Sequence, residues 1–287
     1  RGRVVALNAG GATGSASSFY LPLARVKRVL DLILQDKAVS RGTLRTVFEY
    51  TPYDELRRLG LQGDTEAAVR KAFPSNVGML VVNEVLPGSP TAGVLQPGDI
   101  LTRVNGKYVT TFEPLEQVLD DTVGGEIAVE WERGGKPMSA KLQVTDLHAI
   151  TPSAYLEVGD AILNDLSYQQ ARHFNRPVRG VYVANPGYML AIAGVPRGAV
   201  ITQVSGRNVD NIGDMEAALG QLGDGDFAAV RFFTIDDPNG SQLRSVRMTR
   251  LWFAARRCDR DDKTGLWPCR DLAPGPAPKP AAVGSTM

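Results

Sequence analysis

The chain repeats itself after one hundred residues, and this repeat limits its possible folds more than any other feature. The segment ILTRVNGKYV at residues 100–109 returns as VITQVSGRNV at residues 200–209. A spacing of this size exceeds the roughly 20–50 residues of solenoid and propeller repeats. The sequence therefore predicts two copies of one small domain. Residues identical in both copies, numbered in the first, are Gly98, Val104, Gly106, Val109, Glu116 and Leu119.

Each copy combines strands with a helix. An apolar segment and a Pro-Gly turn lead to a second apolar segment that ends at Asn105-Gly106 or at Ser205-Gly206. Asn-Gly between alternating apolar residues is a strong hairpin signal. The segments EPLEQVLDD and GDMEAALGQL that follow place apolar residues at i, i+3 and i+4, as in an amphipathic helix against a sheet. We predict a mainly β fold with helices (α+β).

Composition excludes several classes of function. With 287 residues, 43% of them hydrophobic, the chain is long enough for two or three domains with their own cores. The net charge is +1, so we expect neither nucleic acid nor a membrane surface as a partner. No apolar run reaches the roughly 20 residues of a membrane-spanning helix. The first residue is Arg1 rather than methionine, and we read the chain as a fragment.

The first copy carries a specific family resemblance. GSPTAGVLQPGDILTRVNGKYV resembles the signature of PDZ domains in the HtrA/DegP serine proteases. The second copy departs from it, with Ala199 where the family usually has aspartate and residues 188–190, Tyr-Met-Leu, where it has small side chains. The resemblance implies two PDZ-like domains, at residues 40–148 and 150–255.

The N-terminal segment resembles the end of an HtrA protease domain. Arg3–Asn8 is predicted as a strand, followed by a loop rich in glycine and serine and by a helix that opens at Pro22. GRVVALNAGG and the residues after it match that family, so residues 1–38 would be the C-terminal remnant of a trypsin-like β-barrel. The resemblance makes Asn8–Phe19 a substrate-pocket loop, and a plain surface loop is the alternative. Its candidate residues are Asn8, Ala9, Gly10, Gly11, Ser15 and Ser17.

The predicted helix lacks most of the domain on which it would pack. Its apolar residues Leu23, Val26, Leu30 and Ile33 have helical spacing. We expect them to form an exposed apolar stripe or to pack on the first PDZ-like domain.

The family resemblance also implies a peptide site in the first copy. Residues 41–46 would bind a terminal carboxylate, and the peptide would lie as an added strand beside residues 44–48, opposite the helix of Leu115 and Leu119. Arg45 replaces the glycine that is usual in this loop, and we expect it, with Arg41, to attract the carboxylate. The alternative is that Leu44 and Phe48 are core residues. The candidates are Arg41, Gly42, Thr43, Leu44, Arg45, Thr46, Phe48, Leu115 and Leu119.

In the second copy the resemblance assigns the same role to Tyr155, Leu156, Glu157 and Val158, with Glu157 in place of glycine. An acidic side chain disfavours a terminal carboxylate. This groove is expected to be inactive or to take an internal segment.

Residues 256–287 are predicted as a C-terminal extension whose Pro/Ala-rich tail is disordered from about Ala273. Cys258 and Cys269 allow a disulfide, a zinc half-site or free thiols, and we expect free thiols. We expect neither a metal nor another cofactor, because His148 and His173 lie far from the cysteines in sequence.

The run RRCDRDDKTGLWPCRDL resembles the nuclear, tandem-repeat HtrA-like proteases of fungi. A prokaryotic relative is the alternative. The fungal resemblance implies the nucleus or cytoplasm, and the prokaryotic one implies the periplasm.

A Ser-His-Asp triad cannot be assembled from this sequence. The family's G-x-S-G-x-P turn is absent, and neither histidine lies in a matching motif. We predict that the fragment is inactive alone and that its parent is a serine endopeptidase. Its partners would be polypeptide substrates, C-terminal or extended peptides, and other HtrA subunits or domains. A non-catalytic PDZ scaffold and a metal-dependent site on Cys258, Cys269 and His173 are the competing hypotheses.

Overall fold

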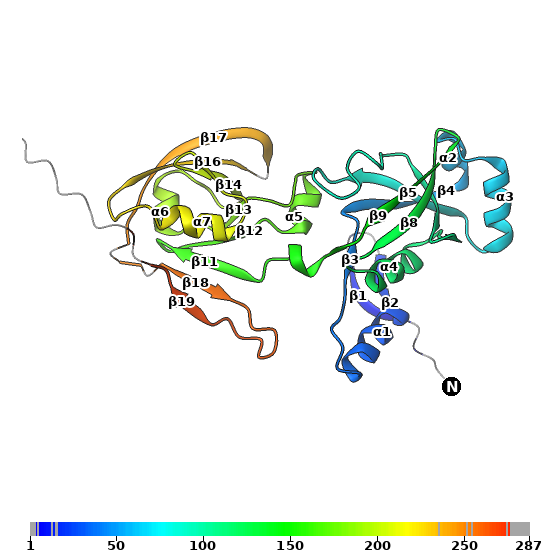
Figure 1. The fold of residues 1–287 in the computed structure, drawn as a ribbon, viewed down its shortest axis with the longest axis horizontal. Helices are drawn as coiled ribbons and strands as arrows, with labels where there is room; N and C mark the ends of the chain where they lie inside the picture. The colour runs from blue at the N-terminus through cyan, green and yellow to red at the C-terminus, as the bar shows by residue number, and fades with distance from the viewer. Residues whose placement is uncertain are drawn as a thin grey trace, which may run out of the picture. The chain divides into compact units, whose positions relative to one another are not determined.

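A computed structural model describes residues 4, 6–12, 14, 17–234, 236–250, 252–253, 255–273 and 275. The chain is mainly β with several helices, which confirms the predicted fold class. It divides into two compact units, one formed by Arg1–Glu84 with Gly93–Asp146 and one by Val85–Ala92 with Leu147–Met287 (Figure 1). In the described part of the chain, no helix is long and apolar enough to cross a membrane.

The first unit is built on a six-stranded sheet with strand order β4-β5-β6-β8-β9, in which β7 pairs with β6. The strands are β4 (Thr46–Pro52), β5 (Gly78–Val85), β6 (Ile100–Val104), β7 (Lys107–Tyr108), β8 (Glu126–Arg133) and β9 (Lys136–Gln143). A separate short pair joins β3 (Gly42–Thr43) to β10 (Thr145–Asp146). The helices are α2 (Tyr53–Arg58), α3 (Gly63–Ala72) and α4 (Phe112–Asp121).

Alternation along the strands explains the core of this unit. In β8, Ile127, Val129 and Trp131 are buried while Glu126 and Ala128 are exposed. Side chains of a strand point alternately to its two faces, so one face of β8 packs inward. Helix α4 supplies Leu115 and Leu119, one turn apart and buried, as the helical spacing predicts.

The N-terminal segment forms a hairpin and a helix. Strand β1 (Ala6–Ala12) pairs antiparallel with β2 (Ser17–Pro22), and α1 (Leu23–Leu34) begins directly after Pro22, as predicted. The predicted loop over residues 8–19 is wrong, because both strands extend into it. Glycine and serine weaken a strand, but their backbone N–H and C=O groups still pair when an antiparallel partner lies alongside.

Of the four apolar residues predicted on helix α1, Leu30 and Ile33 are exposed, while Leu23 and Val26 are partly buried. Leu30 is 51% exposed and Ile33 is 60% exposed. The helix contacts α4 through two ion pairs, Arg25 with Glu116 and Arg28 with Asp121. Its polar side is therefore held on the first unit while these apolar residues stay at the surface.

The second unit is built on a nine-stranded sheet with strand order β17-β16-β14-β13-β12-β11-β18-β19, in which β15 pairs with β14. The strands are β11 (Ala154–Val158), β12 (Ala161–Asp165), β13 (Val181–Asn185), β14 (Ala199–Val204), β15 (Arg207–Asn208), β16 (Phe227–Thr234), β17 (Asp237–Arg247), β18 (Arg256–Asp259) and β19 (Cys269–Asp271). The helices are the 3-10 turn η1 (His148–Ile150), α5 (Tyr168–His173), α6 (Gly187–Ile192) and α7 (Ile212–Leu219).

Two strands of this sheet come from the predicted C-terminal extension. Cys258 of β18 lies opposite Cys269 of β19, and the two form a disulfide. The expectation of free thiols is therefore wrong, because hairpin formation brings together two cysteines that sequence spacing alone does not pair. The predicted disordered tail lies almost entirely outside the described residues.

Candidate functional site

Strand β4 is an edge strand in the described part of the chain. It is the end strand of its sheet, and within the described residues β5 is the only strand that pairs with it. An edge strand presents backbone N–H and C=O groups that an extended peptide can use. Phe48 and Tyr50 of β4 are partly buried, and Glu49 between them is exposed. The first unit therefore offers a place for an added strand.

The loop that leads into β4 lies against the last turn of α4. A Cβ atom on Gly42 would overlap the carbonyl oxygen of Leu119 and contact Val144. Only glycine allows this approach of backbone to backbone. The loop and the C-terminal end of α4 are thus in direct contact, which places the predicted loop beside the predicted helix.

Arg45 adopts the left-handed backbone conformation, with φ of 51°. This region costs a residue other than glycine roughly 1–2 kcal/mol. The family pattern has glycine at this position, so the loop keeps its backbone shape although the residue has changed. The N–H of Arg45 donates to the hydroxyl of Thr43 at 2.9 Å, which stabilises the turn.

Asp120, near the end of α4, is an acceptor for this loop. Its carboxylate accepts from the N–H of Gly42 at 2.9 Å and from the guanidinium of Arg41 at 2.9 Å. The Asp120 side chain is only 5% exposed. Arg41, which the sequence assigns to a peptide carboxylate, is therefore paired with a carboxylate of its own chain. Sequence reasoning missed Asp120, although its place at the end of the predicted helix could have drawn attention to it.

Glu116 lies one turn before Asp120 on the same helix. Burial raises the pKa of its carboxyl, Arg25 opposes that shift, and the nearby Asp120 adds to it. Two acidic groups thus share this side of α4, at a helix terminus that is itself partially negative.

The remaining candidates of the first copy divide into core and surface. Leu44, Leu115 and Leu119 are 2%, 3% and 7% exposed, so they pack in the interior. Thr46 is also buried, and Phe48 is partly exposed. The burial of Leu44 supports the alternative that it is a core residue. Phe48 is partly exposed on the edge strand.

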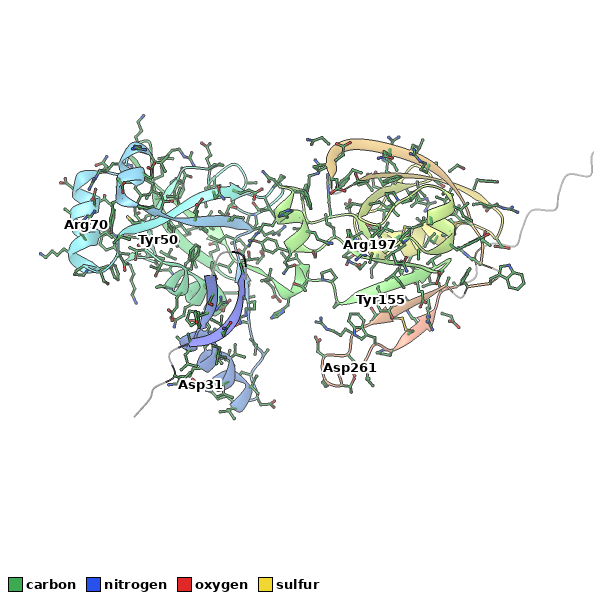
Figure 2. The ribbon with its side chains drawn as sticks, turned by 180° about the vertical axis from the view of Figure 1, so that it is seen from behind. Asp31, Tyr50, Arg70, Tyr155, Arg197 and Asp261 are labelled. Carbon is green, nitrogen blue, oxygen red and sulfur yellow. A yellow bond between two sulfur atoms is a disulfide. The ribbon has the colours of Figure 1, made fainter. Side chains whose placement is uncertain are left out.

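In the second copy, the candidates Tyr155, Leu156, Glu157 and Val158 lie in β11, whose two edges are both paired. Antiparallel partners are β12 on one side and β18 on the other. Tyr155 of β11 is labelled in Figure 2. Leu156 and Val158 are buried in a core that includes Met215 of α7. No backbone edge of β11 is left for an added peptide among the described residues.

Strand β12 is the counterpart of β4, since β4 directly precedes α2 and β12 directly precedes α5. Both edges of β12 are taken, by β11 and by β13. The turn between β11 and β12 contains Gly159 and Asp160, both with left-handed backbone, at φ of 57° and 66°. This tight hairpin places β11 alongside β12. The counterpart of β12 in the first copy, β4, has no such partner on that side among the described residues.

Ion pairs hold the C-terminal hairpin on this unit. Arg256 of β18 pairs with Glu157 of β11. Glu216 of α7 accepts from Arg257 at 3.5 Å and from Arg270 at 2.8 Å. Glu157, predicted at a peptide site, is therefore bonded to the chain's own final strands. The basic residues beside the cysteines are the sequence signal that might have indicated this contact.

The candidates of the N-terminal segment lie on the β1–β2 hairpin. Asn8, Ala9, Gly10 and Gly11 are exposed in β1, and the side chain of Asn8 accepts from the N–H of Gly10. Ser15 lies outside the described residues. Ser17 begins β2.

The hypothesis of a metal site on the cysteines is wrong, because a disulfide leaves no thiolate for a metal. Within the ranges that the structure covers, no group of three or more His, Cys, Asp or Glu side chains is placed to hold a metal ion.

Comparisons with known proteins identify the class. Residues 81–133 match the PDZ domain model and residues 149–225 match the PDZ-like domain model. The first copy therefore contains a PDZ domain and the second a PDZ-like domain.

Over its length, the chain is similar to parts of larger serine proteases. It is 43% identical to Protease Do-like 7 of Arabidopsis thaliana, covering 100% of the chain and 27% of that protein. It is 40% identical to the pro-apoptotic serine protease NMA111 of Coccidioides immitis, covering 97% of the chain and 27% of the relative. The chain is a PDZ-containing homologue of these HtrA-like serine proteases, and it spans under a third of their length.

Among solved structures, the HtrA-type protease AlgW with decapeptide shows 19% identity and a TM-score of 0.35. The similarity covers 50% of this chain and 42% of that one, an overlap too limited to bear on function.

Proposed function

We propose that the chain is the substrate-binding PDZ pair of an HtrA-like serine endopeptidase, and that its first PDZ domain binds an extended polypeptide. The observation that carries this proposal is the edge position of β4 in the described part of its sheet. The homology to serine proteases supports the link to proteolysis. Recruitment of substrates, regulation of cleavage and contact with other protease subunits or domains belong to the same proposal.

Binding takes place by addition of the peptide as a strand beside β4. Backbone hydrogen bonds to the edge supply most of the affinity, and alternate peptide side chains face α4. Phe48 of β4 is partly exposed and offers apolar contact area to those side chains. The peptide is recognised by its extended backbone first and by its sequence second.

Backbone methylation of the peptide tests this mode directly. An edge strand hydrogen-bonds through every second residue of its partner. A binding ten-residue peptide that is N-methylated one position at a time should lose about tenfold in affinity at alternate positions, at roughly 1.4 kcal/mol per tenfold. Equal losses at all positions, or none, in calorimetric titrations of the whole chain would contradict strand addition.

A substitution on β4 gives the matching test on the protein. Phe48→Asp should weaken the unmethylated peptide by about tenfold or more, because a charge then replaces apolar contact area. Phe227→Asp is the control, since Phe227 is a 68% exposed phenylalanine on a strand of the second unit. Equal binding by both variants and the unaltered chain would place the site elsewhere.

A further inference from the structure

Three donors of the loop that opens β4 are bonded within the protein. The Gly42 N–H and the Arg41 guanidinium donate to Asp120, and the Arg45 N–H donates to Thr43. A terminal carboxylate is captured by successive backbone N–H groups of such a loop. Here the carboxylate of Asp120 and the hydroxyl of Thr43 already serve as acceptors.

The charges around the loop disfavour a further anion. Four carboxylates lie on α4, three arginines pair with them, and Arg45 of the loop is a fourth positive charge nearby. The carboxylates belong to Glu113, Glu116, Asp120 and Asp121, and the paired arginines are Arg25, Arg28 and Arg41. The C-terminal end of α4 adds a partial negative charge. Asp120 is nearly buried, so water screens its charge only weakly, and its ion pair with Arg41 offsets part of that charge.

The path of a bound chain is also limited at this end. Gly42 is in backbone contact with Leu119, so the loop and the last turn of α4 leave no gap there. A peptide that lies along β4 and continues past its end must therefore turn away at the loop. A tight turn within the ligand, such as that of a β-hairpin, provides this reversal without a free chain end.

We infer that the first PDZ domain selects internal, turn-containing segments and discriminates against free C-termini, because Asp120 occupies the electrostatic place of a ligand carboxylate. This inference rests on the proposed function, since it concerns the same edge of β4. It names the ligand class as exposed strand-and-turn segments of a polypeptide.

Three ligands of one sequence test the inference with the whole chain. The first is a ten-residue strand with a free C-terminus, the second is its C-terminal amide, and the third continues through Asn-Gly into a short return strand. We expect the amide and the hairpin to bind about tenfold more tightly than the free acid at low salt, with a smaller ratio at high salt. Tighter binding of the free acid would overturn the inference and leave strand addition intact. Failure of all three ligands to bind would instead count against the proposed function.

Asp120→Asn is the decisive variant. The amide oxygen can still accept from the Gly42 N–H, but the charge is removed. We expect the free acid to gain about tenfold in affinity while the amide changes by less than about twofold. An unchanged ratio between acid and amide in a folded Asp120→Asn chain would refute the role of Asp120.

A second variant keeps the test valid if Asp120→Asn fails to fold. Thr43→Val retains the shape of the side chain and removes the hydroxyl that accepts from the Arg45 N–H. The affinity for the free acid should again rise relative to that for the amide, by a smaller factor, because the Arg45 N–H becomes available to the ligand carboxylate. No gain in this variant would show that the loop does not select against the carboxylate through its donors.

Discussion

Gly42 and Arg45 lie three positions apart in one loop and meet opposite physical demands. Gly42 needs space, because its backbone touches that of Leu119, and its φ is not in the left-handed region. Arg45 needs the left-handed conformation and tolerates a large side chain. The sequence pattern marks the second position as the expected glycine, whereas the structure shows that the first is the one that cannot change.

Gly42→Ala should therefore destabilise the first unit strongly. The added Cβ would overlap backbone atoms that cannot swing aside, so we expect a loss of more than about 2 kcal/mol in the free energy of unfolding. Gly63→Ala is the control, because a Cβ at this first residue of α3 meets nothing within 4 Å. It should change stability by less than about 1 kcal/mol. Urea denaturation measures both, and similar losses would contradict the steric argument.

Glu66 of α3 gives a second prediction at the scale of a residue. It accepts from Arg57 of α2 at 2.6 Å and from Arg70 at 2.7 Å, and these bonds lower its pKa from 4.5 to about 2. A lowered pKa in the folded state stabilises the fold above pH 4.5. That stability is lost as the pH falls from 4.5 towards about 2.

Glu66→Gln should remove this dependence on pH. At pH 7 the free energy of unfolding of the unaltered chain should exceed that of the variant by only about 1–2 kcal/mol, because solvent screens the exposed arginine partners of Glu66. This difference should shrink towards pH 3. Glu55→Gln is the matched control, since Glu55 and its partner Arg58 are 50% and 75% exposed. Thermal unfolding measured over this pH range tests the prediction. Unfolding temperatures of Glu66→Gln and of the unaltered chain that changed in parallel with pH would refute it.

At the scale of elements, the repeat predicted local structure well. The hairpins β6–β7 and β14–β15 turn at equivalent positions, where Asn105 and Ser205 have the same φ of 49°. These features follow from short-range turn chemistry, which a sequence displays directly. Short-range turn chemistry could not predict the pairing of β11 with β18, because this pairing joins residues about one hundred positions apart. Strand pairing at such distances depends on tertiary contacts that leave no local pattern.

The β18–β19 hairpin carries the prediction at this scale. Its disulfide closes a loop between cysteines that are 11 residues apart. A loop of this size contributes roughly 2–3 kcal/mol in the chain-entropy description. A dithiol reductant should therefore lower the unfolding temperature of the second unit. The double variant Cys258→Ala with Cys269→Ala should match the reduced chain and ignore the reductant. If the reductant shifted that variant as much as the unaltered chain, the effect would not come from this bond.

At the scale of the whole molecule, the PDZ and PDZ-like domains share a sequence repeat but differ in their strand edges. In the described part of the chain, the first has β4 at the edge of its sheet, and the second covers the equivalent strand with β11 and continues the sheet through β18 and β19. The family resemblance predicted both domains, and the position of the first site stays a prediction. The resemblance did not predict the covered edge of the second, because it assigned residues 155–158 to a binding loop, whereas they form the strand β11 that pairs with β12 and β18.

The covered strand β12 has a consequence for valency. Two linked binding modules can hold one ligand far more tightly than either alone, because the second contact forms at a high effective concentration. With β12 enclosed on both sides, this chain carries two PDZ domains but one open strand edge of this type among its described residues. Under the proposed strand addition, these two domains alone do not provide avidity for a long, unfolded polypeptide, and copies of the chain assembled together would. Retention of the polypeptide would rise steeply with the number of copies assembled around it, and a single chain would release it quickly.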